Sequence, residues 1–390
     1  MEQFCSAIRQ RIYPNTAQVS HLRQEFGACR FVYNWALALR SASWVESKTR
    51  LTSGVIGKKL TALKKEEGKE WLKERTARSI SYALMNLDAA FSNFFSKKAK
   101  YPTFKRKSSY GGSTKYDSSQ FKLIGGGLYL PKLVGEIKVR WTRKLPCSPK
   151  FVTVSQDACG DFWAAFTCDT DPAPRERAAS EIGIDLGITA FATLSTGDKV
   201  KAPDLKRKIE HVKILQRRAS RKVKASNNRR KALRKVARGH RKVTDSRKDF
   251  HHKLSSRLID ENQVIAIEDL AVKNMVKNRK LARAISEQGW SSFTTMLGYK
   301  AKWHGRTVVR VDRFFPSSKT CSCCAFVVEK LPLNIREWEC PRCSTIHDRD
   351  VNAARNILAA SKVVLACGVD GRPVSGSRKK AVGSEAGRKK

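Results

Sequence analysis

Four cysteines in the C-terminal third of the chain have the spacing of a metal site. They are Cys321, Cys324, Cys340 and Cys343, which form two C-x2-C pairs. Each pair can present two thiolates from one tight turn, and two such turns complete a tetrahedral sulfur site for zinc. Four protein ligands leave no coordination position open, so we expect a structural zinc ion. A cluster of buried thiols without metal is the alternative.

The turns after the two cysteine pairs lack the glycine that is common there. Ala325 and Ser344 stand at these positions, which predicts some backbone strain. Cys323 is a fifth thiol in the same segment, and we interpret it as a bystander.

Three carboxylates lie at the ends of predicted elements. Asp185 follows the apolar residues 182–184, and Glu268 ends the apolar segment 264–268. Asp350 lies where the last predicted helix begins. A carboxylate at the end of a buried strand is costly unless it is paired or binds a metal ion. Mg²⁺ prefers oxygen ligands, and a pair of such ions can activate water and stabilise the leaving oxygen in phosphodiester cleavage.

The residues around these acids leave several alternatives open. Asp350 by itself has the position of a helix N-cap, and Asp348 could replace it as a ligand. Asp269 could position Glu268 without binding the metal ion itself, or it could cap the next element. His347, beside Asp348, could be local polar structure.

The chain is strongly cationic. Its 390 residues include 78 Lys and Arg against 35 Asp and Glu, a net charge of +43. Such self-repulsion needs an anionic partner, for which nucleic acid is the first candidate and an anionic membrane surface the second. Residues 206–257 carry 21 basic residues against 3 acidic ones, which favours contact with a phosphate backbone.

Several classes of protein are disfavoured by what the sequence lacks. No apolar segment approaches the ~20 residues of a membrane span, and the N-terminus has no apolar core of a secretory signal. The 11 cysteines are unevenly distributed, which argues against a disulfide framework and for a reducing compartment. No phosphate-binding loop of the GxxxxGK[ST] type and no Ser/His/Asp arrangement stands out.

Periodicity predicts the elements that position these residues. Residues 4–13 form a strand, and helical periodicity continues over about 15–98, where Asn15 and Gln18 have capping-box spacing. Short strands over 128–168 form a small antiparallel unit. An α/β part follows, with strands at 181–195, 264–268 and 307–311, helices at 204–260, 286–303 and 351–364, and a tail from about 366.

The segments that carry the acids and cysteines resemble one family. The chain resembles TnpB (also called OrfB), which insertion sequences encode and which is related to type V CRISPR effector nucleases. The resemblance covers nearly the whole chain apart from the tail. It is carried by FGACRFVYNWALALR, AKYPTFKRK, GIDLGITAFATLS, AIEDLAVKNM, VDRFFPSSKTCSCC, EWECPRC and HDRDVNAARNIL.

The resemblance implies a multidomain α+β fold. An N-terminal wedge-like β-barrel with a helical recognition insert precedes a RuvC-like nuclease domain of RNase H fold, which a zinc-ribbon target-nucleic-acid-binding insert interrupts. The implied boundaries are 1–14 and 115–175 for the barrel, 15–114 for the helical insert, 176–318 and 347–365 for the nuclease domain, 319–346 for the zinc ribbon and 366–390 for a disordered basic tail.

The resemblance also implies RNA-guided, Mg²⁺-dependent cleavage of double-stranded DNA in the bacterial cytoplasm, with association to the nucleoid through nucleic acid. A guide RNA from the transposon end pairs with the target beside a short adjacent motif. The family's acids match Asp185, Glu268 and Asp350, which selects Asp350 over Asp348 by resemblance only. This sequence keeps all three acids of the family pattern. Nuclease-inactive relatives that act as guided regulators lose such acids, so the resemblance argues against that alternative. A strand-joining transposase is the other alternative.

Four aromatic residues are candidates for stacking against a displaced strand, with ordinary packing as the alternative. They are Tyr33, Trp35, Tyr101 and Phe104.

Overall fold

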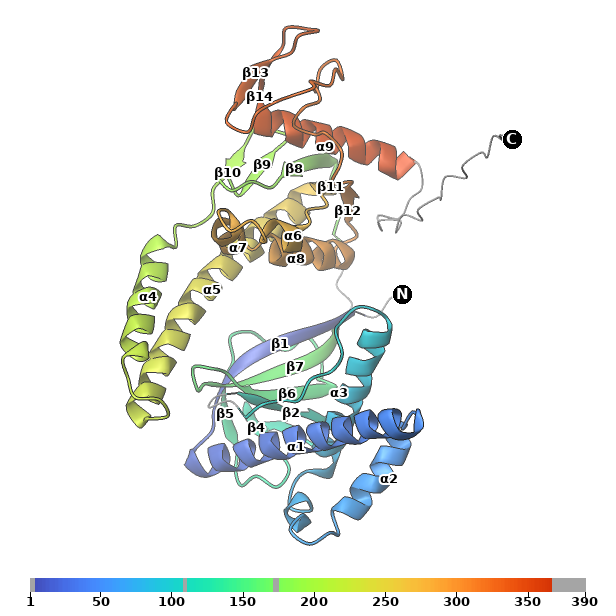
Figure 1. Ribbon diagram of the computed structural model, residues 1–390, viewed down its shortest axis with the longest axis vertical. Coiled ribbons are helices and arrows are strands. Elements are labelled where there is room, and N and C mark those ends of the chain that lie inside the picture. The colour runs from blue at the N-terminus through green and yellow to red at the C-terminus, as the bar shows by residue number, and fades with distance from the viewer. Residues whose placement is uncertain (1–3, 108–110, 171–174, 367–390) are drawn as a thin grey trace, which may run out of the picture. The chain divides into compact units, whose positions relative to one another are not determined.

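The computed structural model describes residues 4–107, 111–170 and 175–366, which divide into two compact units (Figure 1). The first unit comprises residues 1–171 and 206–242, and the second comprises residues 172–205 and 243–390. From residue 367 on, the predicted tail lies outside the described residues.

The first unit contains a curled seven-stranded antiparallel sheet that forms a half-barrel. Its order is β2-β6-β7-β1-β5-β4-β3, so the predicted barrel is found as an open sheet with β2 and β3 at its edges. Alternate residues of β7 are buried, as the pleat of a strand with one core face requires. The strands are β1 (Phe4–Tyr13), β2 (Gly112–Asp117), β3 (Lys122–Ile124), β4 (Gly127–Tyr129), β5 (Ile137–Arg140), β6 (Phe151–Gln156) and β7 (Phe162–Thr170).

Three α-helices and a short 3₁₀ helix lie between β1 and β2. They are α1 (Thr16–Ser47), α2 (Ser53–Leu63), η1 (Glu70–Leu72) and α3 (Ala77–Phe95). The predicted capping box is confirmed: the N–H of Gln18 donates to Asn15 Oδ1 at 2.9 Å, and the N–H of Asn15 donates to Gln18 Oε1 at 3.0 Å. The apolar stripes of α1 and α3 form a shared core, so core packing is confirmed as their role.

Two basic helices follow along the chain, α4 (Lys206–Ser220) and α5 (Asn227–Glu261). Residues 206–242 belong to the first unit, although the sequence-based boundaries assign them to the domain spanning 176–318. Ion pairs give the physical reason, because Arg241 contacts Asp157 at 3.2 Å and Asp161 at 2.5 Å.

The second unit is built on a mixed five-stranded sheet of order β10-β9-β8-β11-β12. β8, β11 and β12 are parallel, and β9 and β10 complete the sheet in antiparallel fashion. The strands are β8 (Ser180–Asp185), β9 (Ala192–Leu194), β10 (Lys199–Val200), β11 (Asn262–Glu268) and β12 (Thr307–Val311). Residues 182–184 of β8 and 265–267 of β11 are buried in succession, because both faces of these central parallel strands are covered.

Four further helices and one hairpin complete the second unit. They are α6 (Val272–Met275), α7 (Ala282–Gln288), α8 (Trp290–Trp303), α9 (Arg349–Ala366) and the strand pair β13 (Glu337–Glu339) and β14 (Ile346–Asp348). Phe191 packs edge-on against Phe250 and Phe293 at centroid distances of 5.0 and 5.1 Å, which joins the sheet, α5 and α8 in one core. Within the described ranges, none of the helices has the length and apolar character to cross a bilayer.

Candidate functional site

Two parallel strands bring two of the predicted acids to one edge of the second sheet. β8 and β11 pair with Ile184 opposite Ile267. The next residues along these strands are Asp185 and Glu268, which therefore end next to each other. The two isoleucines before the acids are buried. Their burial fixes the register, because a slip by one residue would turn each strand over.

Helix α9 brings the third acid to the same edge. It packs against β8 at Gly183, where a Cβ atom would lie 2.1 Å from the carbonyl oxygen of Ala354. Only glycine permits this close approach of helix and strand. Asp350 lies in the first turn of α9 and is the strongest charged neighbour of the Asp185 carboxyl.

Asp348, the alternative ligand, has a different position. Its carboxylate accepts the backbone N–H groups of Asp350 at 3.1 Å and Val351 at 3.0 Å, so it caps α9. It also pairs with Lys199 at 2.6 Å. Burial raises the pKa of Asp348, but Lys199 and the two N–H donors lower it more, and the net pKa is below its usual value. The capping role therefore belongs to Asp348 and not to Asp350.

Asp185, Glu268 and Asp350 lie at this edge, and we call them the acid cluster. Burial and like charge raise the pKa of two of them, Asp185 and Glu268. Burial is the main reason why the pKa of Asp185 rises to about 7, and the carboxylates of Asp350 and Glu268 add to it. Arg349 opposes this rise. The pKa of Glu268 is raised by burial and then by Asp269. The three carboxylates offer hard oxygen atoms, which are the kind of ligand that Mg²⁺ prefers.

Arginine side chains contact Asp350 and Asp269, the residue that follows Glu268. Asp269 pairs with Arg313 and lies 3.9 Å from Arg310, so it is held beside Glu268 by β12 and the loop that follows. Arg336 Nη1 lies 3.5 Å from Asp350 Oδ1.

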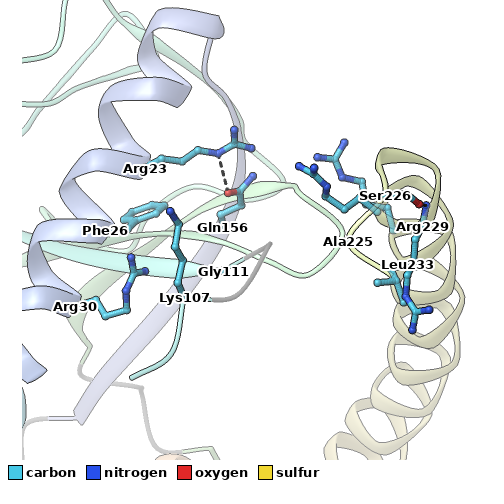
Figure 2. Close-up of a pocket in the computed structure, with 12 residues that line it drawn as sticks. Arg23, Phe26, Arg30, Lys107, Gly111, Gln156, Ala225, Ser226, Arg229 and Leu233 are labelled. Carbon is cyan, nitrogen blue, oxygen red and sulfur yellow. Dashed lines mark hydrogen bonds between the residues drawn. The ribbon is translucent and has the colours of Figure 1, made fainter. Parts of the chain in front are cut away.

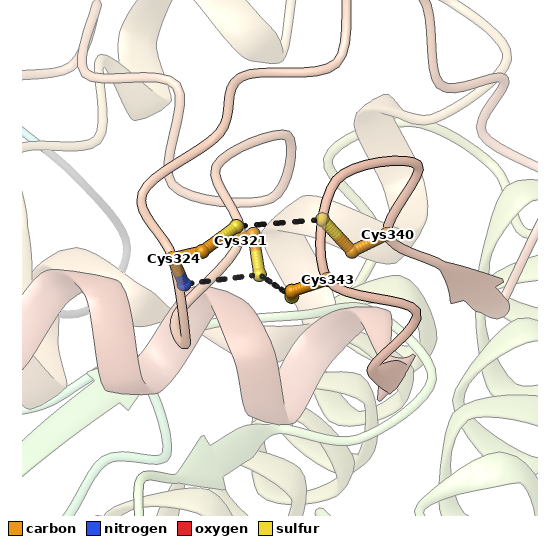
Figure 3. A group of neighbouring side chains, drawn as sticks. All are labelled: Cys321, Cys324, Cys340 and Cys343. Atoms are coloured by element: carbon orange, nitrogen blue, oxygen red, sulfur yellow. Dashed lines mark hydrogen bonds between the residues drawn. The ribbon is translucent and has the colours of Figure 1, made fainter.

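The four predicted cysteines converge (Figure 3). Their sulfur atoms all lie within 4.8 Å of one another, and the Cys321–Cys343 and Cys324–Cys340 pairs are each 3.6 Å apart. Sulfur atoms around a tetrahedral zinc ion would be ~3.8 Å apart, given Zn–S bonds of ~2.3 Å. The cysteine cluster, as we call these four residues, could therefore hold a metal ion such as zinc.

The strain expected in the two turns is present. Ala325 has a φ of 60° and Ser344 a φ of 54°, in the left-handed region that favours glycine. In each turn the backbone N–H of this residue donates to the carbonyl oxygen of the first cysteine of its pair at 2.9 Å. Cys323 is exposed and lies outside the cysteine cluster.

Two asparagines that the sequence analysis missed join the cysteine cluster to α9. Asn352 accepts the N–H of Ser322 at 2.9 Å and donates to the carbonyl oxygen of Thr320 at 2.7 Å. Asn356 donates to the same carbonyl oxygen at 2.6 Å. Their spacing of four residues, which puts both amides on one face of a helix, was the signal available in the sequence. One helix thus carries an acid of the acid cluster and the supports of the cysteine cluster.

His347 has a local structural position. It is buried, its ring lies 4.9 Å from that of Trp338, and its Nε2 lies 3.0 Å from Cys321 Sγ. His347 therefore packs against the cysteine cluster. This position agrees with its interpretation as local polar structure.

The four candidate aromatic residues divide into two groups. Tyr33 is buried in the helical core and Trp35 packs against that core. Tyr101 and Phe104 are exposed, and the Tyr101 hydroxyl lies 2.9 Å from Ser41 Oγ. The second group is the more accessible for stacking, since Trp35 is partly buried and Tyr33 is buried.

The fold resembles that of a chain in a solved complex. The solved structure described as "Cryo-EM structure of the Cas12f1-sgRNA-target DNA complex" superposes with a TM-score of 0.59 at 12% identity, covering 91% of this chain and 98% of that chain. At this level of identity the match establishes the fold alone.

Family models match three segments of the chain. Residues 165–279 match OrfB_IS605, described as "Probable transposase", and residues 290–357 match "Cas12f1-like, TNB domain". Residues 4–49 match a model described as "Helix-turn-helix domain", although this segment folds as β1 and the single helix α1.

Two curated relatives extend over nearly the whole chain. A Streptomyces pristinaespiralis protein named "Putative RNA-guided DNA endonuclease" is 45% identical over 96% of this chain and 93% of its own length. InsQ of Escherichia coli K12, which has the same description, is 32% identical over 94% of this chain and 96% of its own length. The chain therefore belongs to the TnpB (OrfB) family of transposon-encoded proteins.

Proposed function

We propose that the protein is an RNA-guided, Mg²⁺-dependent DNA endonuclease of an insertion sequence. The observation that carries this proposal is the convergence of Asp185, Glu268 and Asp350, which come from three separate segments of the chain. The carboxylates of Asp350 and Glu268 raise the pKa of the buried Asp185, and such repulsion between neighbouring acids has no structural benefit by itself. The descriptions of the full-length relatives as RNA-guided DNA endonucleases support the same reaction.

Each acid would act as a ligand and catalytic residue of a RuvC-like site. Bound Mg²⁺ would supply activation of water and stabilisation of the leaving oxygen in phosphodiester cleavage. Gly183 allows α9 to approach β8, and Asp348 fixes the start of the helix, so together they hold Asp350 in position. Arg349, which is buried and donates to the carbonyl oxygen of Pro332, lies close enough to lower the pKa of Asp185.

The four cysteines of the cysteine cluster would hold a structural Zn²⁺. Four sulfur ligands complete its coordination, so the ion would stabilise the zinc-ribbon insert without reacting. Because Asn352 and Asn356 fasten this insert to α9, zinc binding would also stabilise the helix that carries Asp350.

The partners would be a guide RNA from the transposon end and target double-stranded DNA beside a short adjacent motif. The net charge of +43 supports a polyanionic partner. Base pairing would read the target sequence, while the protein holds the backbone. The exposed rings of Tyr101 and Phe104 are suited to stack on unpaired bases.

Substitution of one acid tests the reaction. Asp185→Ala should abolish Mg²⁺-dependent cutting of a target plasmid while leaving binding of guide RNA and target nearly intact. The matched control is Asp198→Ala, which removes an exposed acid from the β9–β10 turn and should cut normally.

Two outcomes would favour the alternatives. A wild-type complex that binds guide and target with Mg²⁺ present and never cuts would be a guided regulator. Strand transfer by the purified protein without guide RNA would identify a transposase.

A further inference from the structure

The turn that follows β12 carries an exposed aromatic ring at the sheet edge where the acid cluster lies. Phe314 is 85% exposed, and no other aromatic side chain in the described ranges is more exposed. Single apolar side chains are common on protein surfaces, so exposure alone assigns no role to this ring. The role follows from the place of the turn, its rigidity and the charge around it.

Strand pairing puts this turn beside the acid cluster. β12 pairs with β11 so that Val311 lies opposite Glu268, and the N–H of Asp269 donates to the carbonyl oxygen of Val311 at 2.9 Å. Phe314 follows three residues after Val311, so its Cα atom lies within ~16 Å of that of Glu268. Arg313, the residue before the ring, pairs with Asp269. The ring is therefore held near the residues that would cut a phosphodiester.

Contacts on both sides of the ring hold the turn in place. Asp312 Oδ1 accepts the N–H of Phe314 at 2.8 Å, and the carbonyl oxygen of Asp312 accepts the N–H of Phe315 at 3.1 Å. Phe315 packs against the small core that β11, β12 and α9 share. Further along, Asn356 of α9 donates to the carbonyl oxygen of Ser317 at 2.8 Å. A ring on a turn that is already ordered loses little conformational entropy when it binds a ligand.

The charge near the ring favours an anionic ligand. Arg313 pairs with the carboxylate of Asp269, and Arg310 lies 3.9 Å from the same carboxylate, so two guanidinium groups share one negative charge. Proteins that bind single-stranded nucleic acid combine cations, which contact phosphates, with accessible aromatic rings, on which bases stack. The turn after β12 offers both.

We propose that Phe314 stacks on an unpaired base of the strand held at the acid cluster and thereby positions the neighbouring phosphate for cutting. The proposal rests on the proposed function, because it names a residue that positions the substrate of that reaction. Stacking tolerates any base, so such a contact suits a nuclease whose target is selected by pairing with a guide. Phe314 differs from Tyr101 and Phe104 in belonging to the same unit as the acids.

Three substitutions at Phe314 separate stacking from general apolar contact. Phe314→Ala removes the ring, Phe314→Leu keeps an apolar side chain, and Phe314→Trp keeps an aromatic one. Each variant is assembled with the guide RNA that co-purifies with the chain, and single-turnover cutting of a matching DNA duplex is measured in Mg²⁺ with the complex in excess. The control Val363→Ala shortens a 64% exposed side chain near the end of α9, whereas Asp350 lies in its first turn.

We expect Phe314→Ala to slow cutting by at least about fivefold while affinity for the target duplex changes by about twofold or less. Phe314→Trp should restore cutting, Phe314→Leu should be as slow as Phe314→Ala, and the control should cut at the wild-type rate. None of these variants should melt below the wild type, because the side chains are exposed. Wild-type cutting by Phe314→Ala, or its recovery in Phe314→Leu, would overturn the stacking role.

Base fluorescence tests the same contact without any cutting. In the Asp185→Ala background, 2-aminopurine replaces the target nucleotides one at a time in each strand. An indole ring in contact with this base quenches its fluorescence, so adding Phe314→Trp should quench one stretch of the target and adding Phe314→Leu should not. Equal fluorescence of the two at every position would overturn the proposal. Quenching in this series, together with a wild-type complex that never cuts, would contradict only the proposed endonuclease activity.

Discussion

The acid cluster contrasts with a pocket of the first unit (Figure 2), the cationic pocket, which is lined by Arg23, Arg30, Lys107, Arg229, Arg230 and Arg234. The acid cluster gathers carboxylates, of which that of Asp350 lies 3.5 Å from Arg336, and the cationic pocket gathers cations. A carboxylate can take up a proton, and the pKa of Asp185 at about 7 shows that its cluster can neutralise itself in part. Guanidinium groups cannot do this. The acids can therefore be partly buried at a strand end, whereas the arginines line a pocket that water can enter.

The cysteine cluster extends the comparison to sulfur. Its thiols are neutral when protonated, so they can lie close together without a counter-charge, but they gain their full stabilising effect only as thiolates on a metal ion. Occupied by zinc, this cluster would be the most stabilising of the three.

The largest expected effect is therefore loss of a zinc ligand. Cys340→Ser should lose about one zinc ion per chain by elemental analysis and lower the melting temperature strongly, because zinc binding contributes directly to folding. Cys323→Ser is the matched control, since this exposed thiol lies outside the cluster and its loss should change neither quantity. Unchanged zinc content in Cys340→Ser would refute the ligand set.

Substitution in the acid cluster should have a smaller effect on stability, and it should stabilise the protein instead of destabilising it. The folded pKa of Asp185 lies above its unfolded value, so the folded state binds the extra proton and wild-type stability falls as pH rises from about 4 to about 7. In buffer without Mg²⁺ at pH 8, Asp185→Asn should be more stable than wild type by up to about 4 kcal/mol. At pH 4 the difference should nearly vanish. A variant that melts below wild type at pH 8 would show that the carboxylates do not repel one another.

The smallest effect on stability is expected at Glu25, a buried acid for which no acidic neighbour contributes to the pKa shift. Burial raises the pKa of Glu25, while the N–H of Thr76, at 3.0 Å, and Arg75 oppose the rise. Among the described residues, Glu25 Oε2 and His21 Nε2 are buried without hydrogen-bond partners, and His21 Nε2 lies 3.7 Å from the other carboxylate oxygen. Burial also lowers the pKa of His21, so its neutral ring can accept a hydrogen bond.

Glu25→Gln should therefore stabilise the protein at pH 7 by about 1 kcal/mol, because the new amide can donate to His21 and remain an acceptor for Thr76. Wild-type stability from Glu25 is lost as pH rises, so the gain should shrink in acid. Glu67→Gln, at an exposed position, is the control for thermal melting. A gain as large as that of Asp185→Asn would mean that burial alone, without the neighbouring carboxylates, governs the acid cluster.

Short-range sequence patterns were sufficient to predict the cysteine cluster and several local features of the fold. The spacing of Cys321, Cys324, Cys340 and Cys343 predicted a cluster that the structure brings together. The sequence also predicted the capping box of Asn15 and Gln18 and the apolar stripes of α1 and α3. Each of these features depends on residues within a few helical turns of one another. The family followed from the motifs.

Tertiary structure gave Asp348 and Asp350 different positions. The sequence alone left Asp348 and Asp350 as alternatives, and only the two N–H groups that Asp348 accepts at the start of α9 separate their positions. The cationic pocket was equally hidden, because its walls are about 200 residues apart in the chain and no local period links Arg30 to Arg234. The sequence determined the kinds of charge and the local elements. Contacts between distant segments determined which charges face one another. Examples are the packing of Gly183 against α9 and the pairing of β8 with β11.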